Sequence, residues 1–484
     1  MKAFVVGRYG SKDGLQMRDM PEPGIGPHDV LVAVRAASVN LLDAKIRDGQ
    51  FRRILPYRVP FVLGNDLAGR VVRVGSAVRS FAPSDEVYAR PGTDTIGTFA
   101  ELAAVHQDDL ALKPATLTIE EAAALPLVAL TAWQALVERA NLQPGQKVLI
   151  HAGSGGVGTI AIQLARHLGA HVATTTGAAN TGWVKDLGAD VVIDYRREDF
   201  EKVLRGYDAV LDSLGGQTLE KSLRVLRPGG IAIGIAGPPD PGFAREIGAN
   251  LVVRLATALL SGRTRLRARR RRVRYSFLFM KASGEQLRAI AALVDAGTIR
   301  LVLDRVFPFE AVKDAMTYVE SGRAKGKVVI TMADLPPADG SQVSVPSPCP
   351  RTVYESEYPK VASTGTCDDR SSRTTACVAG GGAPCPVPDE SSDRNAPADH
   401  APPAPAPSTT STSTTATARP RRPRGCAWPA FPAAAAPSRW LASPPRETVL
   451  LMTLTCSHVS IRARLGAADA DRRSTRRGTA ASWV

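Results

Sequence analysis

The sequence predicts an α/β protein built around a doubly wound parallel sheet, and two observations support this. The first is a strand–loop–helix unit at 148–170. It opens with apolar, partly β-branched residues, passes through a glycine cluster and continues as an apolar helix that stops near Gly169. The second is the alternation of strand-like and helix-like segments that follows. This βαβα order is typical of a parallel sheet with helices on both faces.

The glycine cluster has the spacing G-x-G-x-x-G. Gly153, Gly155 and Gly158 hold the three glycine positions, and Gly156 and Val157 precede the last of them. Glycines permit a tight turn and a close approach to a pyrophosphate, and the following helix offers free N–H groups and the positive end of its dipole. The pattern alone is weak, but here a strand precedes it, and a helix and a second strand follow. It predicts a dinucleotide phosphate site, with a ligand-free glycine turn as the alternative.

The flanking segments predict a second, β-rich domain. Short strand candidates occur before residue 124, separated by glycine and proline, at 3–6, 29–36, 69–74, 86–89 and 99–105. Helices expected at 118–125 and 127–140 lead into the glycine unit. Strands expected at 302–307 and 327–331 follow the completed central sheet, so we expect them to return to the β-rich domain. The predicted domains are therefore 1–124 with 300–332, and 125–299.

Residues 333–484 differ in composition from the rest. They are rich in Pro, Ala, Ser, Thr and Arg, and they hold 21 of the 36 prolines and all six cysteines. This predicts a disordered, dispensable, low-complexity tail. The remaining sequence then has no disulfide framework or thiolate metal site. No apolar run reaches the ~18 residues of a membrane span, and no signal peptide precedes the first strand, so we expect a cytoplasmic protein.

The net charge of +15 is concentrated in one run. Eight arginines lie between Arg263 and Arg274, directly after an amphipathic segment at 247–260. One interpretation is a contact with nucleic acid or an anionic membrane surface. The other is a solvated helix face on an insertion that covers the substrate cleft.

An ordered series of motifs accompanies the glycine loop along residues 1–332. It includes Asn40-Leu-Leu-Asp43, Pro60-Phe-Val-Leu-Gly64-Asn-Asp66, Gly97-Thr-Phe-Ala-Glu101, Leu130-Thr131-Ala-Trp, Asp212-Ser-Leu-Gly215-Gly216 and Gly326-Lys327-Val-Val. The series resembles the medium-chain dehydrogenase/reductase superfamily, in its zinc-independent quinone oxidoreductase branch. The resemblance implies a GroES-like partial β-barrel domain, a Rossmann domain and a cofactor cleft between them.

Metal chemistry is disfavoured by two amides. Asn40 and Asn65 stand where zinc dehydrogenases of this superfamily carry a cysteine and a histidine, and amides are poor zinc ligands by comparison. We therefore expect no metal site. The compatible reaction is hydride transfer from reduced nicotinamide to a small electrophilic acceptor, a quinone or an α,β-unsaturated carbonyl (enone or enal), with charge developing on the carbonyl oxygen.

The resemblance also suggests site residues. It places Asn40 beside the nicotinamide or its ribose and adds Thr131 and Lys327 to the cofactor-binding set, although Lys327 could equally be an exposed strand-edge lysine. Lys45 is a candidate cationic donor to the developing enolate, and Tyr57 a candidate proton donor or ring stack. A solvated helix lysine, a packing tyrosine and a proton from water are the alternatives.

The choice between NAD and NADPH depends on the residues at the end of the strand that follows the glycine loop and its helix. NAD-binding proteins place an acidic residue there for the ribose 2′-hydroxyl, whereas residues 174–180 contain none, which favours NADPH. The loop departs from related reductases by having Gly177 in place of serine and no lysine or arginine before Lys185. The expected contacts of the 2′-phosphate region are Thr175, Thr176, Asn180 and, by the resemblance, Tyr195.

Two other functions stay open at this point. One is a freestanding enoyl-thioester reductase. The other is a non-catalytic protein of the same fold that senses NADPH or binds nucleic acid. A homodimer is expected. His151, on the buried strand before the glycine loop, is interpreted as a core histidine, and Asp66 as a backbone anchor near the cleft.

Overall fold

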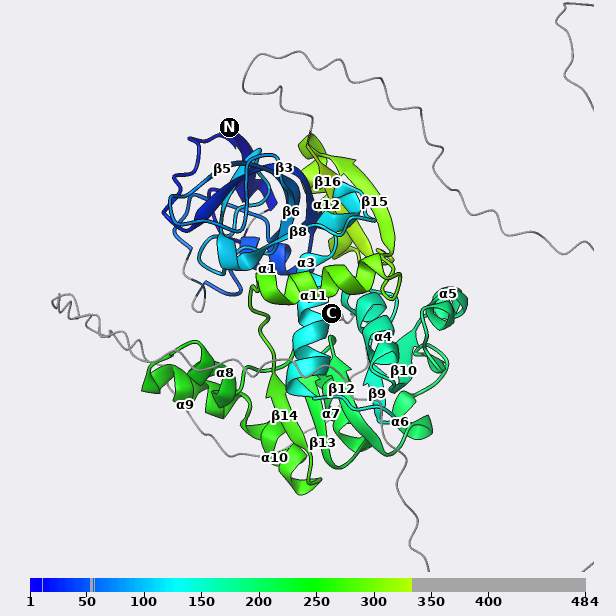
Figure 1. The fold of residues 1–484 in the computed structure, drawn as a ribbon. Helices are drawn as coiled ribbons and strands as arrows, with labels where there is room; N and C mark the ends of the chain where they lie inside the picture. The colour runs from blue at the N-terminus through cyan, green and yellow to red at the C-terminus, as the bar shows by residue number, and fades with distance from the viewer. Residues whose placement is uncertain (11, 53–54, 56, 333–484) are drawn as a thin grey trace, which may run out of the picture. The chain divides into compact units, whose positions relative to one another are not determined.

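The computed structural model describes residues 1–10, 12–52, 55 and 57–332 (Figure 1). They belong to one compact unit that contains both predicted domains. The predicted tail at 333–484, with all the cysteines, lies outside the described residues. Within them, no helix has the length and apolar character needed to cross a membrane.

The glycine unit lies in a six-stranded parallel sheet, which confirms the predicted α/β class. The strand order is β11-β10-β9-β12-β13-β14. The strands are β9 (Lys147–Ile150), β10 (His171–Thr176), β11 (Val191–Asp194), β12 (Tyr207–Asp212), β13 (Leu226–Gly234) and β14 (Arg274–Phe277). The chain runs outward from β9 in one direction and then returns to continue in the other. The loop after β9 therefore lies at the point where strand order reverses, where open α/β sheets bind their ligands.

Helices cover both faces of this sheet because β9 is apolar on both sides. Val148 and Ile150 belong to a core shared with α3 (Pro126–Trp133), α4 (Gly156–His167) and α11 (Gly284–Asp295). Leu149 belongs to a separate core with α6 (Phe200–Val203), α7 (Gly216–Val225) and α10 (Gly262–Arg270). Successive residues of a strand face opposite sides, so three consecutive apolar residues serve both layers.

The remaining strands form the β-rich domain. Its seven-stranded sheet has the order β15-β16-β3-β5-β6-β8, with β7 also paired to β3, and a three-stranded sheet has the order β2-β1-β4. The strands are β1 (Lys2–Val6), β2 (Leu15–Asp19), β3 (Asp29–Val39), β4 (Phe61–Val62), β5 (Asp66–Val74), β6 (Glu86–Ala89), β7 (Leu102–His106), β8 (Leu110–Leu112), β15 (Leu303–Pro308) and β16 (Lys327–Thr331). β16 pairs antiparallel with β3, so the last strands return to this domain as expected.

Short helices complete the domain and join it to the parallel sheet. They are α1 (Leu41–Arg47), α2 (Ile119–Ala123) and α12 (Val312–Glu320). The exact domain boundaries given above stay a prediction.

Several elements differ from the sequence expectation. The helix expected at 127–140 is α3 up to Trp133 and a π-helical segment, Gln134–Arg139, beyond it. The first part of the arginine run, up to Arg270, forms α10, as the interpretation of a helix face expected, and Arg274 begins β14. Helix α5 (Thr181–Asp186) belongs to the alternation of strands and helices expected after the glycine unit, and α9 (Leu251–Leu260) lies in the amphipathic segment at 247–260, whereas α8 (Pro241–Glu246) was missed.

Candidate active site

The glycine loop connects β9 to α4 in a way that only small residues permit. A Cβ on Gly153 would lie 2.2 Å from Thr174 Oγ1, and one on Gly158 would lie 2.3 Å from the Ala152 carbonyl oxygen. A Cβ on Gly155 would meet only that same oxygen, at 3.4 Å. Two glycines are thus required by packing inside the protein, while a Cβ on Gly155 would make only an ordinary van der Waals contact.

The beginning of α4 is free to bind an anion. Gly155 is its N-cap residue, and within the described part of the chain no side chain caps this end of the helix. The first N–H groups of a helix have no partner within the helix, and the dipole makes this end positive. The loop therefore fits the pyrophosphate of a dinucleotide, as the sequence predicts.

The loop is also attached to the neighbouring strand. Ala152 adopts a left-handed conformation, with φ 54°, which is uncommon for a residue other than glycine. The Ala152 N–H donates to Thr175 Oγ1 at 3.3 Å, and the Gly153 N–H donates to the Thr175 carbonyl oxygen at 2.9 Å. These bonds to β10 hold the turn in its strained form.

The last strand of the other domain contacts the same loop. The Gly326 N–H donates to the Ser154 carbonyl oxygen at 2.9 Å, and Gly155 and Gly326 form an isolated parallel bridge. Gly326 has φ 79°, and a Cβ there would lie 2.1 Å from the Val302 carbonyl oxygen. This glycine lets β16 come close enough to bind the glycine loop.

Lys327, the next residue, extends from the loop into the β-rich domain. Its Cδ lies 2.9 Å from the position a Cβ would take on Gly156, and its Nζ donates to Asn40 Oδ1 at 2.6 Å. The side chain is only 4% exposed, and burial lowers the pKa of its ammonium group. The alternative of an exposed strand-edge lysine is wrong, because β16 lies between β15 and β3 within the sheet.

The carboxylate of Asp66 is the acceptor at the centre of this region. Its Oδ2 accepts from Ser38 Oγ at 2.7 Å, from Asn40 Nδ2 at 2.8 Å and, at 3.4 Å, from Lys327 Nζ. Its Oδ1 accepts from the Leu127 N–H at 2.8 Å, in the first turn of α3. Asp66 thus anchors a helix start, where a negative charge is favourable, as the sequence reading expected of it.

A second carboxylate, that of Asp43, lies beside the first. It accepts from the Asn40 N–H and from Asn65 Nδ2, each at 2.7 Å. Burial raises the pKa of Asp43 to about 7, and the hydrogen bonds from Asn65 and Asn40 oppose this rise. Arg90 Nη2 donates to Asn65 Oδ1 at 3.4 Å. We call Ser38, Asn40, Asp43, Asn65, Asp66, Arg90 and Lys327 the buried polar network.

The two asparagines at the expected zinc-ligand positions are fully engaged in this network. The Asn40 amide contacts Asp66 and Lys327, and the Asn65 amide contacts Asp43 and Arg90. Among the described residues, no group of three or more His, Cys, Asp or Glu side chains could hold a metal ion. Amide groups that bind carboxylates and cations in this way leave a poor donor set for zinc.

The two candidate catalytic residues do not join the network. Lys45 is half-buried on α1. The Tyr57 hydroxyl donates to the Thr93 carbonyl oxygen at 2.7 Å, and burial raises its pKa to about 12. The Tyr57 ring lies 5.1 Å from that of Phe61, an arrangement that favours the packing role.

Three expected cofactor contacts direct their hydroxyl groups into the protein. Thr131 Oγ1 donates to the Leu127 carbonyl oxygen at 2.7 Å, and Thr176 Oγ1 donates to Ser154 Oγ at 3.0 Å. Thr175 Oγ1 is 3.1 Å from Nδ1 of His151. His151 is buried, as expected of a core residue, and burial lowers its pKa to about 3.

The surface beyond β10 carries a cation that the sequence analysis overlooked. β10 and β11 are paired up to Thr176 and Asp194, so the residues after both strands lie at the same edge. Tyr195 is 59% exposed, and a Cβ on Gly177 would come within 4.0 Å of its ring. The Arg196 guanidinium lies 5.7 Å from the centre of that ring. The parallel order of the two strands was the available signal.

Asn180 also lies at this edge, and the oxygen of its side-chain amide has a hydrogen-bond partner. Its Oδ1 accepts from Trp183 Nε1 at 3.2 Å, and its side chain does not cap α5. Its Nδ2 group is therefore able to point toward a ligand at the surface.

An aromatic group joins the two domains. The ring centres of Phe51 and Phe279 are 6.0 Å apart, and that of Phe279 is 5.8 Å from Phe243 on α8. Both Phe51 and Phe279 are half-buried. They offer an apolar surface to a flat ring.

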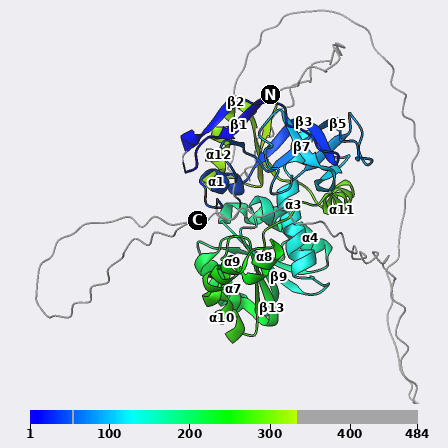
Figure 2. The same cartoon turned by 90° about the vertical axis from the view of Figure 1, so that its left-hand side faces the viewer.

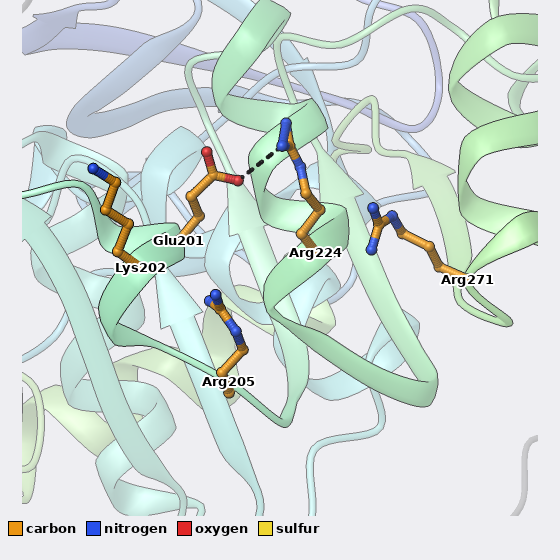
Figure 3. Close-up of a pocket in the computed structure, with 5 residues that line it drawn as sticks. All are labelled: Glu201, Lys202, Arg205, Arg224 and Arg271. Carbon is orange, nitrogen blue, oxygen red and sulfur yellow. Dashed lines mark ion pairs between the residues drawn. The ribbon is translucent and has the colours of Figure 1, made fainter.

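A separate basic pocket is not part of the cofactor site. Figure 3 shows the side chains that line it: Glu201, Lys202, Arg205, Arg224 and Arg271. Arg205, Arg224 and Arg271 come just before β12, β13 and β14, respectively. Because these strands are parallel to β9, the pocket lies at the opposite end of the sheet from the glycine loop.

Comparison with known proteins agrees with this geometry. Residues 26–115 match the family model described as an alcohol dehydrogenase GroES-like domain, and residues 187–330 match that of a zinc-binding dehydrogenase. The mouse (Mus musculus) NAD(P)H oxidoreductase RTN4IP1, mitochondrial, is 36% identical over 355 residues, which cover 69% of this chain and 89% of that protein.

The chain belongs to the medium-chain dehydrogenase/reductase superfamily. Within it, the chain is quinone oxidoreductase-like. The NADPH-dependent alkenal/one oxidoreductase, chloroplastic, of Arabidopsis thaliana is 34% identical over 342 residues, covering 68% of this chain and 79% of that protein. The structure of Escherichia coli quinone oxidoreductase complexed with NADPH superposes with a TM-score of 0.57, at 25% identity, over 68% of this chain and 100% of that one.

The β-rich domain and the parallel-sheet domain of this chain are joined at β16, because β16 pairs with β3 and the residue before it, Gly326, contacts the glycine loop.

Proposed function

We propose that this chain is an NADPH-dependent reductase that transfers hydride to a quinone or to an α,β-unsaturated carbonyl. The observation that carries the proposal is the glycine loop at the switch point of the sheet, bound by Gly326 and Lys327 to a buried polar network. Relatives with these activities, and the NADPH complex of a structural neighbour, support it.

Reduced nicotinamide, when bound, supplies a hydride to an electron-poor carbon of the acceptor. Asn40 and Lys327 are proposed to lie at the nicotinamide end, since both are adjacent to the glycine loop through β16. Their mutual hydrogen bond and the carboxylate of Asp66 fix their orientation. Groups held in this way need not reorganise as charge develops, which is the main source of electrostatic stabilisation in enzymes.

Lys45 is proposed as the donor to the acceptor carbonyl oxygen. Its half-buried position on α1 and the absence of an ion pair with any described residue leave its ammonium group available. Phe51 and Phe279 are proposed to contact the acceptor ring from either domain. Replacing Phe279 with Ala then raises the KM for a naphthoquinone and leaves the KM for NADPH unchanged.

Selectivity for NADPH is proposed to come from Arg196, together with Tyr195 and Asn180. Arg196 supplies the cation that the loop after β10 lacks, and guanidinium groups bind phosphate through paired hydrogen bonds. Arg196→Ala is expected to raise the KM for NADPH about tenfold or more, and to leave that for NADH unchanged. Arg197→Ala is the matched control, because Arg197 lies 3.7 Å from Asp194 instead. Equal effects on both cofactors would contradict this assignment.

A metal-free reaction is proposed from the donor chemistry of Asn40 and Asn65. Turnover is then unchanged after dialysis against a strong chelator, and the purified chain contains no stoichiometric zinc. Restoration of lost activity by added zinc would refute this part of the proposal.

The decisive experiment measures NADPH consumption with three acceptors: a naphthoquinone, an enal and an enoyl-thioester. Turnover of the first two supports the proposal. Turnover of the thioester alone would identify an enoyl-thioester reductase, and tight NADPH binding without any turnover would identify a non-catalytic protein. The homodimer and the cytoplasmic location stay predictions, which sedimentation and imaging test; the two relatives named above carry mitochondrial and chloroplastic labels.

A further inference from the structure

Helix α9 presents its apolar residues to solvent. Leu251, Val252, Leu255, Leu259 and Leu260 are 78%, 75%, 62%, 75% and 66% exposed, and Thr257 is the helix's buried residue. A surface helix normally turns its apolar side toward the core. Single exposed leucines are common, but a contiguous group of this kind marks a site of interaction.

The position of α9 is well defined by its neighbours. The Val253 N–H donates to Asn250 Oδ1 at 3.0 Å, which caps the helix, and Ser261 Oγ at its other end donates to the Thr257 carbonyl oxygen at 2.7 Å. The helix packs on α8 and α10. It lies at the left of the nucleotide-binding domain in Figure 1 and faces the viewer in Figure 2. The apolar face is therefore held outward by the fold.

The arginine series that follows α9 lies in a segment with no acidic residue of its own. Residues 247–284 contain nine arginines and one lysine, and no Asp or Glu, so this segment carries a charge of +10. Of the eight arginines from Arg263 to Arg274, Arg267 pairs with Glu220; none of the others forms an ion pair with a described acidic residue. Unpaired cations beside an apolar face are complementary to a surface that is both anionic and apolar.

The positive surface continues beyond α10. Arg271 lines the pocket in Figure 3 together with Lys202, Arg205 and Arg224. Among the described residues that line this pocket, Glu201 is the single acidic one, and it pairs with Arg224 at 3.1 Å. The pocket can hold a phosphate group next to the arginine series.

We propose that α9 and the arginines of α10 dock this chain onto an anionic phospholipid membrane. The leucines of α9 enter the boundary between headgroups and acyl chains, and the arginines bind lipid phosphates. This inference does not depend on the reductase activity. It concerns a peripheral contact, since α9 has ten residues and cannot span a bilayer.

Two other occupants fit the same face less well. Nucleic acid would pair with the arginines but leave the leucines exposed, and single strands are bound through aromatic side chains, whereas the exposed side chains of α9 are leucine and valine. A second copy related by two-fold symmetry would place a second arginine series against the first, and these like charges would repel.

The test is sedimentation of the full chain with lipid vesicles. One set contains phosphatidylcholine alone, and the other replaces roughly one-third of it with phosphatidylglycerol. The chain is expected to bind the anionic vesicles at low salt and to dissociate at high salt, because exposed charges are screened. Leu255→Ser/Leu259→Ser and Arg269→Glu/Arg270→Glu are each expected to weaken binding about tenfold or more.

Arg288→Glu/Arg300→Glu is the matched control, with the same charge change at exposed arginines away from α9 and α10. It should retain most of the binding, and all three variants should keep the wild-type melting temperature. The proposal is overturned by absence of vesicle binding, or by binding that neither pair of substitutions weakens. It is also overturned if the two leucine substitutions convert a dimer to monomers without weakening vesicle binding. The same holds if the two arginine substitutions abolish binding to RNA without weakening vesicle binding.

Discussion

The glycine loop allows a test in which one added methyl group separates two roles of its glycines, packing inside the protein and binding of the pyrophosphate. Gly158→Ala places a Cβ 2.3 Å from the Ala152 carbonyl oxygen and 2.7 Å from Gly153 Cα. Both are backbone atoms of the loop, so no side chain can rotate away. An ordinary contact begins near 3.4 Å, and the loop must therefore move by about 1 Å. Gly155→Ala adds the same methyl group where the protein has room.

The size of the effect follows from this displacement. Overpacking of this kind costs about 1–3 kcal/mol, which lowers the melting temperature by about 2–4 °C per kcal/mol in a domain of this size. Loss of one hydrogen bond to a charged phosphate costs about 1.5–3 kcal/mol, so the NADPH dissociation constant of Gly158→Ala should rise about 10- to 100-fold. For Gly155→Ala we expect an unchanged melting temperature and weaker NADPH binding, because its methyl group points toward the pyrophosphate.

The assay combines calorimetric titration of NADPH with thermal unfolding. Gly262→Ala, which adds a methyl group in open space at the start of α10, is the control and should resemble the wild type in both measurements. The reasoning is refuted if Gly158→Ala binds NADPH like the wild type, or if Gly155→Ala lowers the melting temperature as much as Gly158→Ala.

Three further predictions concern the β-rich domain. The pKa of Asp43 is raised from 3.8 to about 7, so its ionisation opposes folding. The wild type should therefore lose stability relative to Asp43→Asn as pH rises from about 4 to 7, which thermal unfolding across this range measures. Lys327→Met leaves the buried Asp66 carboxylate without its cation and should cost about 3–5 kcal/mol in urea unfolding, a loss that Asp66→Asn in the same chain partly restores. Tyr57→Phe should cost about 1 kcal/mol, because the bond to Thr93 is lost, and change kcat less than about threefold; a drop of about 100-fold would make Tyr57 the proton donor.

Features encoded within one short stretch were predictable. The glycine loop, its strand and its helix fall within 148–170, and the local pattern of apolar residues and glycines specifies all three. The structure has β9 at Lys147–Ile150 and α4 at Gly156–His167, close to that expectation. Hydrophobic periodicity carries this information because it depends only on neighbours along the chain.

The buried polar network could not be assembled from the sequence. Asn40 and Lys327 are 287 positions apart, and their hydrogen bond exists only because β16 pairs with β3. Asp43 and Asp66 each look isolated in sequence, yet both contact Asn40. Their juxtaposition requires the register of the strands, which pattern reading does not provide.

The threonines of β10 show a different limit. A run of hydroxyls at the end of a strand is compatible with a phosphate site, but Thr175 and Thr176 bind Ala152 and Ser154 of the glycine loop. A hydroxyl bonds to whichever partner is nearest, and burial beneath the loop decides which one that is. The exposed cation, Arg196, is the residue directly after Tyr195, which was the expected contact.

The hydrogen bond from Gly326 to Ser154 has a consequence for the order in which the protein is made. A ribosome has added all the glycines of the loop when it reaches residue 158. Gly326, which binds this loop, and the strand β16 that follows it are added only at 326–331. Until then the nascent nucleotide-binding half has the glycine loop without the hydrogen bond from Gly326 and without the side chain of Lys327. The contact between the glycine loop and the last strand is thus made late in synthesis, after the residues of both domains have been added to the chain.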